Sequence, residues 1–520
     1  MKTREAQSMN IKRLLQRVMQ FAAVLVLSAI TVGTASAQVD IYVDSSGGTD
    51  GPTCNGTSPV VGTFPNCPFR TLTYALSVAS SSDVIELAAG SYTGPHTFGV
   101  SGITVQGRNV NANTDIFLTG DVTVTADVTF ASVGAQFFPA GPNFRLVSGS
   151  MGIDASSTFQ LPDGVIITRT NGDMDGDLVN NAPPTFIGTT NLIYDSAAFD
   201  VDQVAGNEVP VNAAGGVLGI TMSGGGTPTL TFPASLTAGP IAIFPGNTSN
   251  VAFQGTVTGA SITVNDANSH TFANAAVTAG DFVTDSGATV VTGNLETNGF
   301  RLLQTGGTGA FTSTGTVSNS ALGSNDGVDG DGGAAAWIVH DATSMTLNNV
   351  DLSFTHNNDG GSDFYVQSIQ KITGDLTIGG TITEGIVVDG DETDVSWVEV
   401  IVEAGIFTVS QANTISGLVT NQASLVFSAG GTLNGDVDNQ SPAVITIGSG
   451  TLDLTSDIPA FTELNMFAGS GTLLLSGDAD VPATGITTGG NLELAGDNDG
   501  LGGADLAVGG ALVVSGDGDW

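Results

Sequence analysis

The sequence predicts an all-β solenoid in which parallel strands stack in coils of about 20 residues, and three observations near the C-terminus indicate it. A Gly-x-Leu phrase recurs after residue 430, and its glycines lie 19, 21, 19 and 20 residues apart. Each phrase continues with apolar residues two positions apart, such as Leu452 and Leu454, which places both on one face of a strand. A Gly or Ser and then an Asp close most units, as expected of a turn. The glycines of the phrase are Gly431, Gly450, Gly471, Gly490 and Gly510.

Residues 1–37 have the features of a secretory signal peptide. Basic residues precede an apolar run at 21–32, and an Ala-Ser-Ala cleavage site follows at 35–37. The run is too short to span a bilayer, and Gly and polar residues interrupt every later apolar run. We therefore expect an exported protein, secreted or held at the cell surface, with no membrane span in the mature chain.

The mature chain is strongly acidic. Removing residues 1–37 takes away five of the 11 basic residues and one of the 50 acidic residues, which leaves a net charge near −43. Such a chain repels phosphate groups, so we expect no nucleic-acid partner and no binding to an anionic membrane. Hydrophobic residues make up 41% of the sequence, which is enough to build a core despite the 72 glycines.

The N-terminal part, 38–107, is predicted to be a separate capping module. Residues 41–43 form a strand, and a Gly- and Pro-rich loop after them carries the only two cysteines, Cys54 and Cys67. In an exported chain, two cysteines this close together indicate a disulfide. A zinc site is the alternative, but no further thiol and no nearby His completes a ligand set.

A short helix is predicted next, over residues 69–79. Its apolar residues have helical spacing, and the run contains neither Gly nor Pro. Strands are expected after it, at 84–87 and 103–105.

These segments resemble a known family. Ile41-Tyr42-Val43-Asp44, the helix with its preceding Pro68, and Asp83 to Tyr92 resemble the opening of secreted right-handed parallel β-helix proteins of the pectin-lyase-like superfamily. The resemblance covers about seventy residues and implies a single-stranded right-handed parallel β-helix. It also implies that the helix closes the N-terminal end, where an open coil would expose apolar side chains.

Residues 108–520 are expected to be the coils of this β-helix, with an excursion loop at 325–333, where apolar residues are almost absent. The repeat is at its most regular where the sequence stops, and no polar cap follows Gly510. We therefore expect the repeats to continue in a longer chain, or a partner to cover the last coil.

The sequence lacks the enzyme signatures of this family. The sequence contains no Asp-Asp pair, no Gly-His-Gly, no Arg-Ile-Lys and no Gly-x-Ser-x-Gly, so no motif identifies a catalytic or cofactor-binding residue. Four histidines are scattered along the chain, and we expect them at the surface or in turns. They are His96, His270, His340 and His356.

Calcium is the only cofactor that the residues suggest. Asn171, Asp173 and Asp175, followed by Gly176, match the first half of an EF-hand loop, although Ala182 stands where the last ligand, a Glu, would be. Further acids gather at 326–331 and 389–394. The alternative in each case is a solvated turn in an acidic protein.

A second candidate calcium site follows from the repeat. Four aspartates lie seven residues after the glycine of their unit, so in-register coils would stack them about 4.8 Å apart. Such a column is expected to bind Ca²⁺ weakly or to make stability depend on ionic strength, unless each residue only forms a turn. The four are Asp457, Asp478, Asp497 and Asp517.

Two functions remain open on the sequence. The absence of catalytic motifs and the long repetitive surface favour a non-catalytic protein, adhesin-like or in contact with polysaccharide or another surface protein. The fold alone supports the other hypothesis, a polysaccharide lyase or glycoside hydrolase with an unrecognised site.

Overall fold

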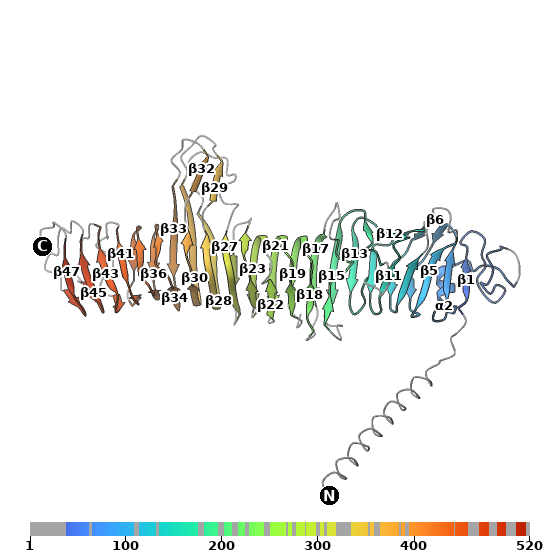
Figure 1. Cartoon of the computed structure of the whole chain (residues 1–520), viewed down its shortest axis with the longest axis horizontal. Helices are drawn as coiled ribbons and strands as arrows, with labels where there is room; N and C mark the ends of the chain where they lie inside the picture. The colour runs from blue at the N-terminus through green and yellow to red at the C-terminus, as the bar shows by residue number, and fades with distance from the viewer. Residues whose placement is uncertain are drawn as a thin grey trace, which may run out of the picture.

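The protein is one elongated solenoid whose coils follow each other in chain order along the rod (Figure 1). The structure is a computed structural model. It describes residues 38–61, 65–108, 114–131, 135–174, 181–195, 202–210, 217–223, 228–243, 250–266, 269–272, 277–286, 288–297, 302–305, 309–318, 334–351, 354–357, 364–383, 386–389, 395–440, 442–455, 467–477, 486–495 and 506–515.

The described strands form three faces, and every ladder between named strands is parallel, which confirms the predicted all-β parallel solenoid. The first face contains β4 (His96–Phe98), β7 (Val122–Val124), β10 (Asn143–Leu146), β13 (Val165–Arg169), β15 (Thr190–Asp195), β17 (Val217–Ser223), β19 (Leu236–Ile243), β21 (Val257–Asp266), β23 (Val277–Ser286), β26 (Leu302–Thr305), β28 (Ala334–Asp351), β30 (Phe364–Ile378), β33 (Val395–Val402), β36 (Val419–Asn421) and β39 (Val437–Asn439).

The second face follows in each coil. It contains β1 (Asp40–Val43), β2 (Val84–Leu87), β5 (Ile103–Gly107), β8 (Val128–Ala131), β11 (Met151–Ile153), β16 (Gln203–Val204), β18 (Leu230–Phe232), β20 (Val251–Phe253), β22 (Ser269–Phe272), β24 (Thr289–Thr292), β27 (Ala310–Ser318), β34 (Ile406–Val409), β37 (Ser424–Phe427), β40 (Val444–Ile447), β42 (Phe467–Gly469), β44 (Ile486–Thr488) and β46 (Leu506–Val508).

The third face completes the coil. It contains β3 (Gly90–Tyr92), β6 (Thr114–Leu118), β9 (Ala135–Pro139), β12 (Thr158–Leu161), β14 (Thr185–Phe186), β25 (Leu295–Thr297), β31 (Ile382–Thr383), β35 (Asn413–Ile415), β38 (Gly431–Leu433), β41 (Thr451–Leu454), β43 (Thr472–Leu475), β45 (Asn491–Leu494) and β47 (Leu512–Val514). Long strands such as β28 bend around corners and pair on more than one face.

The C-terminal repeat has the predicted strands, with one change of register. Leu473 pairs with Leu452 on one side and with Leu492 on the other, so these leucines share one interior column. Leu433, however, pairs with Leu454 and not with Leu452. The phrase at 431 is therefore offset by two residues, which a period-two strand tolerates because the same side chains still face inward.

The predicted helix is shorter than its apolar pattern. Helix α2 spans Leu72–Val78, and Thr71 caps it by accepting a hydrogen bond from the Tyr74 backbone N–H at 3.2 Å. Phe69 is not helical; it forms an isolated parallel bridge with Val43 and is buried. Helix α2 lies at the N-terminal end of the described rod, as the resemblance implied (Figure 1).

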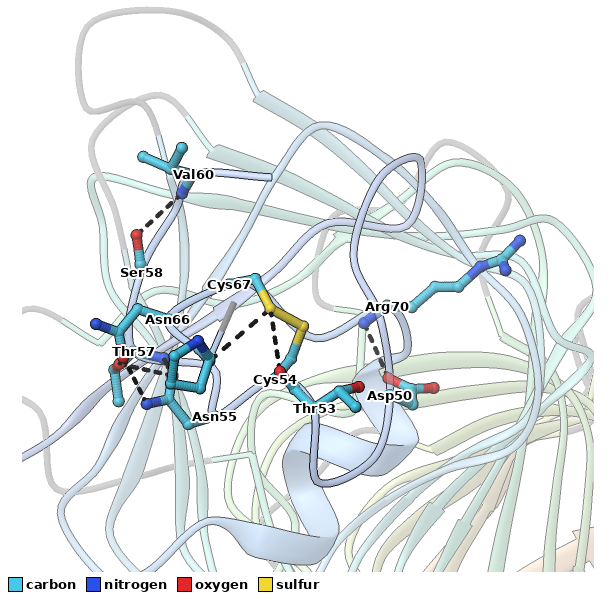
Figure 2. The surroundings of a disulfide bond; sticks show 11 residues. Asp50, Thr53, Cys54, Asn55, Thr57, Ser58, Val60, Asn66, Cys67 and Arg70 are labelled. Carbon is cyan, nitrogen blue, oxygen red and sulfur yellow. Dashed lines mark hydrogen bonds between the residues drawn. A yellow bond between two sulfur atoms is a disulfide. The ribbon is translucent and has the colours of Figure 1, made fainter. Parts of the chain in front are cut away.

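The predicted disulfide is present in the loop before this helix. Cys54 and Cys67 are bonded and nearly fully buried (Figure 2). In the same loop the Asp50 carboxylate accepts hydrogen bonds from the Arg70 and Thr71 backbone N–H groups, at 2.9 and 3.0 Å. The loop is thus tied both to itself and to the start of α2.

Replacing both cysteines with Ser is expected to lower the free energy of unfolding of the N-terminal module by roughly 3 kcal/mol, because the cross-link restricts the unfolded chain. Thermal unfolding of the double variant against the parent measures the loss. Mass spectrometry of exported parent protein should show a mass lower by two hydrogens than the reduced form, and two free thiols would contradict the disulfide.

Aromatic rings stack inside the rod at the spacing of the strands. The Phe232 and Phe253 ring centroids lie 4.8 Å apart, and those of Phe253 and Phe272 lie 4.6 Å apart, with nearly parallel planes. Neighbouring parallel strands are about 4.8 Å apart, so identical inward residues on successive coils meet face to face. The core is therefore a set of columns running along the rod.

One protrusion leaves the side of the rod near β30 and β33 (Figure 1). Its strands β29 (Phe354–Asn357) and β32 (Ile386–Asp389) pair with each other and with no other described strand. The sequence did not predict it, because Ile386-Val387-Val388 has the same apolar character as an ordinary coil strand. The excursion loop predicted at 325–333 lies outside the described residues.

Candidate functional site

One column of the first face brings together seven of the buried polar residues, among them Arg169, His340 and Lys371. Strand register places one inward residue per coil in this column, and stretches of apolar members alternate with stretches of polar members along the rod. From the N-terminal end the column reads Phe98, Val124, Leu146, Arg169, Tyr194, Met222, Ile243, Val264, Thr284, Gln304, His340, Lys371, Val402, Asn421 and Asn439. We call it the polar column.

Arg169 forms a buried ion pair with Glu208. The Arg169 side chain is 3% exposed and that of Glu208 is fully buried. Arg169 also donates to the Val204 carbonyl at 2.7 Å and to Gln203 Oε1 at 2.9 Å. Burial alone would lower the pKa of Arg169, but the Glu208 carboxylate raises it above its ordinary value. The guanidinium is therefore permanently charged inside the rod.

Tyr194 completes this network from the next coil. Its hydroxyl donates to Glu208 Oε1 at 3.2 Å, and the Gly206 backbone N–H donates to Oε2 at the same distance. The segment around Glu208 is therefore held by hydrogen bonds to two successive coils. Sequence reasoning missed the network because Arg169 and Glu208 are 39 positions apart and belong to no motif.

A second polar group occupies the column at Gln304, His340 and Lys371. His340 Nδ1 lies 2.8 Å from Gln304 Oε1, so this nitrogen carries the hydrogen and Nε2 is left as an acceptor in the neutral ring. Among the described residues, neither His340 Nε2 nor Lys371 Nζ has a hydrogen-bond partner. All three side chains are almost completely buried.

Burial shifts the protonation of both basic groups in this cluster. It lowers the pKa of Lys371 to about 8, only partly offset by the Asp375 carboxylate. Burial, with the Lys371 charge on the neighbouring strand, lowers the pKa of His340 to about 4. At neutral pH the rod therefore contains a neutral imidazole beside a buried ammonium group.

The placement of the histidines corrects the sequence expectation. His96, His270 and His340 are at most 1% exposed, so the prediction of surface or turn positions was wrong for these three. His96 and His270 occupy inward positions of strands that alternate between buried and exposed residues, whereas His340 ends a run of three buried residues in β28. The side chain of His356 lies outside the described residues.

Asn421 and Asn439 end the polar column with an amide-to-amide hydrogen bond. Asn421 Nδ2 donates to Asn439 Oδ1 at 2.7 Å, and Asn421 Oδ1 accepts from the Ala423 backbone N–H at 3.3 Å. Because both amides are satisfied locally, these buried residues join adjacent coils at a turn.

Many surface acids and amides have the same joining role. A side-chain oxygen of one coil accepts a hydrogen bond from a backbone N–H of the next, and where the donor is Thr189 this lowers the pKa of Asp163. The pairs are Asp127 with Ser150, Asp163 with Thr189, Asp202 with Thr229, Asn250 with Ser269, Asn294 with Thr316, Asn349 with Thr381, Asp375 with Ile406, and Asn491 with Ala511.

The candidate calcium ligands are only partly described. Asp173 forms an isolated parallel bridge with Ser150, and its carboxylate accepts a hydrogen bond from the Ser150 hydroxyl. Within the described ranges no group of three or more His, Cys, Asp or Glu is placed to hold a metal. Asp175, Asp457, Asp478, Asp497 and Asp517 lie outside those ranges, so calcium binding stays a prediction both for the Asn171 loop and for the aspartate column.

An open groove of about 490 Å³ lies on the third face between β31 and β35. Ile382 leads directly towards the protrusion, so the groove adjoins the root of that structure. Its lining is uncharged and consists of Thr381, Ile382, Ala412, Asn413, Thr414, Gly431 and Thr432.

Comparisons with known proteins do not assign a family. No protein-family model, curated protein or solved structure matches the chain. In the described part of the chain no helix has the length and apolar character needed to cross a membrane.

Proposed function

We propose that the protein is an exported, non-catalytic rod that contacts polysaccharide or another surface protein. The observation that supports it most is the burial of the basic side chains that could take part in proton transfer. Lys371 and three histidines are buried in the rod, where a polymer at the surface cannot reach them. Arg169 is neutralised by Glu208 in the same interior.

The outer surface supports a binding role. Among the described residues, several surface Asp and Asn side chains are engaged in joining coils, as with Asp163 and Thr189. A stack of parallel coils presents the same kinds of outward groups at regular intervals, which suits contact with a repetitive or extended partner. The signal-peptide features of residues 1–37 support export.

An activity screen on acidic and neutral polysaccharides tests the proposal. We expect binding in affinity electrophoresis without release of reducing or unsaturated ends. Release of either by purified protein would favour the competing hypothesis of a lyase or hydrolase. A preparation of the Lys371→Met variant serves as a control, because activity that survives it cannot depend on the buried amine.

A further inference from the structure

The groove on the third face lies where a side chain, and not a neighbouring strand, forms hydrogen bonds with the backbone of β31. Strand β31 pairs with β28, and β35 pairs with β38, but β31 and β35 do not pair with each other. Instead Asn413 Oδ1 accepts a hydrogen bond from the Ile382 backbone N–H at 2.8 Å, and Asn413 Nδ2 donates to the Gly380 carbonyl at 3.1 Å. The carboxamide thus does what a peptide group of a neighbouring strand would do.

Polar groups of β35 face this opening. The Asn434 backbone N–H donates to the Ile415 carbonyl at 2.9 Å, so Ile415 belongs to the ladder with β38. Alternate residues of a parallel strand bond to opposite neighbours, so Thr414 directs its backbone N–H and C=O towards the groove. The Thr414 side chain is exposed and that of Thr432 is partly exposed, and both outline the groove with hydroxyl groups.

A glycine keeps the groove open. Gly431 has φ +151°, and a Cβ at this position would lie 2.5 Å from the Asn413 carbonyl oxygen. A larger residue would therefore push β35 and β38 apart as well as occupy the groove. The opening is therefore set by the buried Asn413 carboxamide and by the absence of a side chain at Gly431.

We infer that this groove binds a segment of an uncharged polysaccharide. The inference rests on the proposed function and adds a site and a class of ligand. Sugar hydroxyls both donate and accept hydrogen bonds, which matches threonine hydroxyls and the backbone groups of Thr414. The volume falls within the roughly 300–1,000 Å³ of ordinary ligand sites.

Electrostatics decides between neutral and acidic polymers. The lining has no charged residue, and the whole sequence has a net charge of −39. A uronic acid polymer would meet a repulsive field with no cation in the groove to offset it. A neutral polysaccharide is not repelled by this field, so we expect neutral polysaccharides to bind more tightly than acidic ones.

The test measures binding of a soluble neutral β-glucan, a neutral galactomannan and polygalacturonate by affinity electrophoresis and calorimetry. The variant is Thr432→Phe, which fills the groove from an outward strand position. Its matched control is Thr446→Phe, on β40 of the second face, where the side chain also points outward and is partly exposed. Both variants should keep the parent's melting temperature, because Phe is well accepted on strand surfaces.

We expect the parent to bind at least one neutral polymer more tightly than polygalacturonate, and Thr432→Phe to weaken that binding at least about tenfold while Thr446→Phe leaves it unchanged. Equal binding by parent and Thr432→Phe would overturn the groove while leaving the proposed function intact. Preference for polygalacturonate would overturn the neutral class. A parent that binds none of the three would count against the groove and the polysaccharide role together.

Discussion

Replacing Glu208 with Ala is expected to lower the free energy of unfolding by about 3–5 kcal/mol, because it leaves the buried Arg169 guanidinium without its counter-ion. The substitution also removes the acceptor for the Tyr194 hydroxyl. Equilibrium unfolding in urea, followed by circular dichroism, measures the loss. A loss of this size would show that the network of Arg169, Glu208 and Tyr194 is the main polar contribution to the stability of the coils around residues 169–208.

Two controls separate charge from packing. The double variant Arg169→Met with Glu208→Leu should recover most of the loss, since apolar residues of similar volume need no counter-ion. Arg145→Met, at an exposed position of β10, should change stability by less than about 0.5 kcal/mol. If Glu208→Ala lowers the free energy of unfolding no more than Arg145→Met does, the ion pair between Arg169 and Glu208 does not stabilise the fold.

Replacing Lys371 with Met is expected to raise stability at pH 7, on the order of 3 kcal/mol. The pKa of Lys371 is about 8 in the fold, against about 10.4 in an unfolded chain. The native state therefore binds fewer protons than the unfolded state between these values, so protonation opposes folding and stability of the parent rises with pH across that window. Removing the amine removes the penalty, as replacement of buried charges by apolar groups often does.

Thermal unfolding of parent and variant at pH 7, 8, 9 and 10 checks the sign as well as the size. The difference between them should be largest at pH 7 and should shrink as the pH approaches 10, because the parent then buries a neutral amine. A difference that stays constant with pH would show that Met only packs better, and a less stable variant would show that Lys371 has a stabilising partner. Lys371→Arg, which keeps the charge, should be no more stable than the parent.

The coil architecture could be predicted because it depends on local signals. Apolar alternation, as in Leu452 and Leu454, and the cysteine pair of the N-terminal loop each act over short stretches of chain. The helix was predicted too long because Phe69 continues its apolar spacing, whereas Thr71 provides the cap that starts it.

The polar column could not be predicted, because it depends on contacts between residues that are far apart in the sequence. Whether a His or Lys faces inward depends on strand register across coils 31 to 36 residues apart, as for Gln304, His340 and Lys371. Charged residues are seldom fully buried, so residue type argued for the surface. The groove could not be predicted for the same reason. Nothing in the sequence around Asn413 indicates that its side chain hydrogen-bonds to the backbone of the preceding coil.

The direction of the hydrogen bonds between coils determines how the rod responds to tension. These bonds lie along the long axis, so a pull on the two ends strains the hydrogen bonds on all three faces of each junction, the contact between two successive coils, at the same time. When one junction opens, about 20 residues can extend by roughly 65–70 Å, while the remaining coils stay paired. Under such tension the rod is expected to lengthen in steps of one coil, and the Asp and Asn side chains that bond to the next coil add to the resistance of the coils they join.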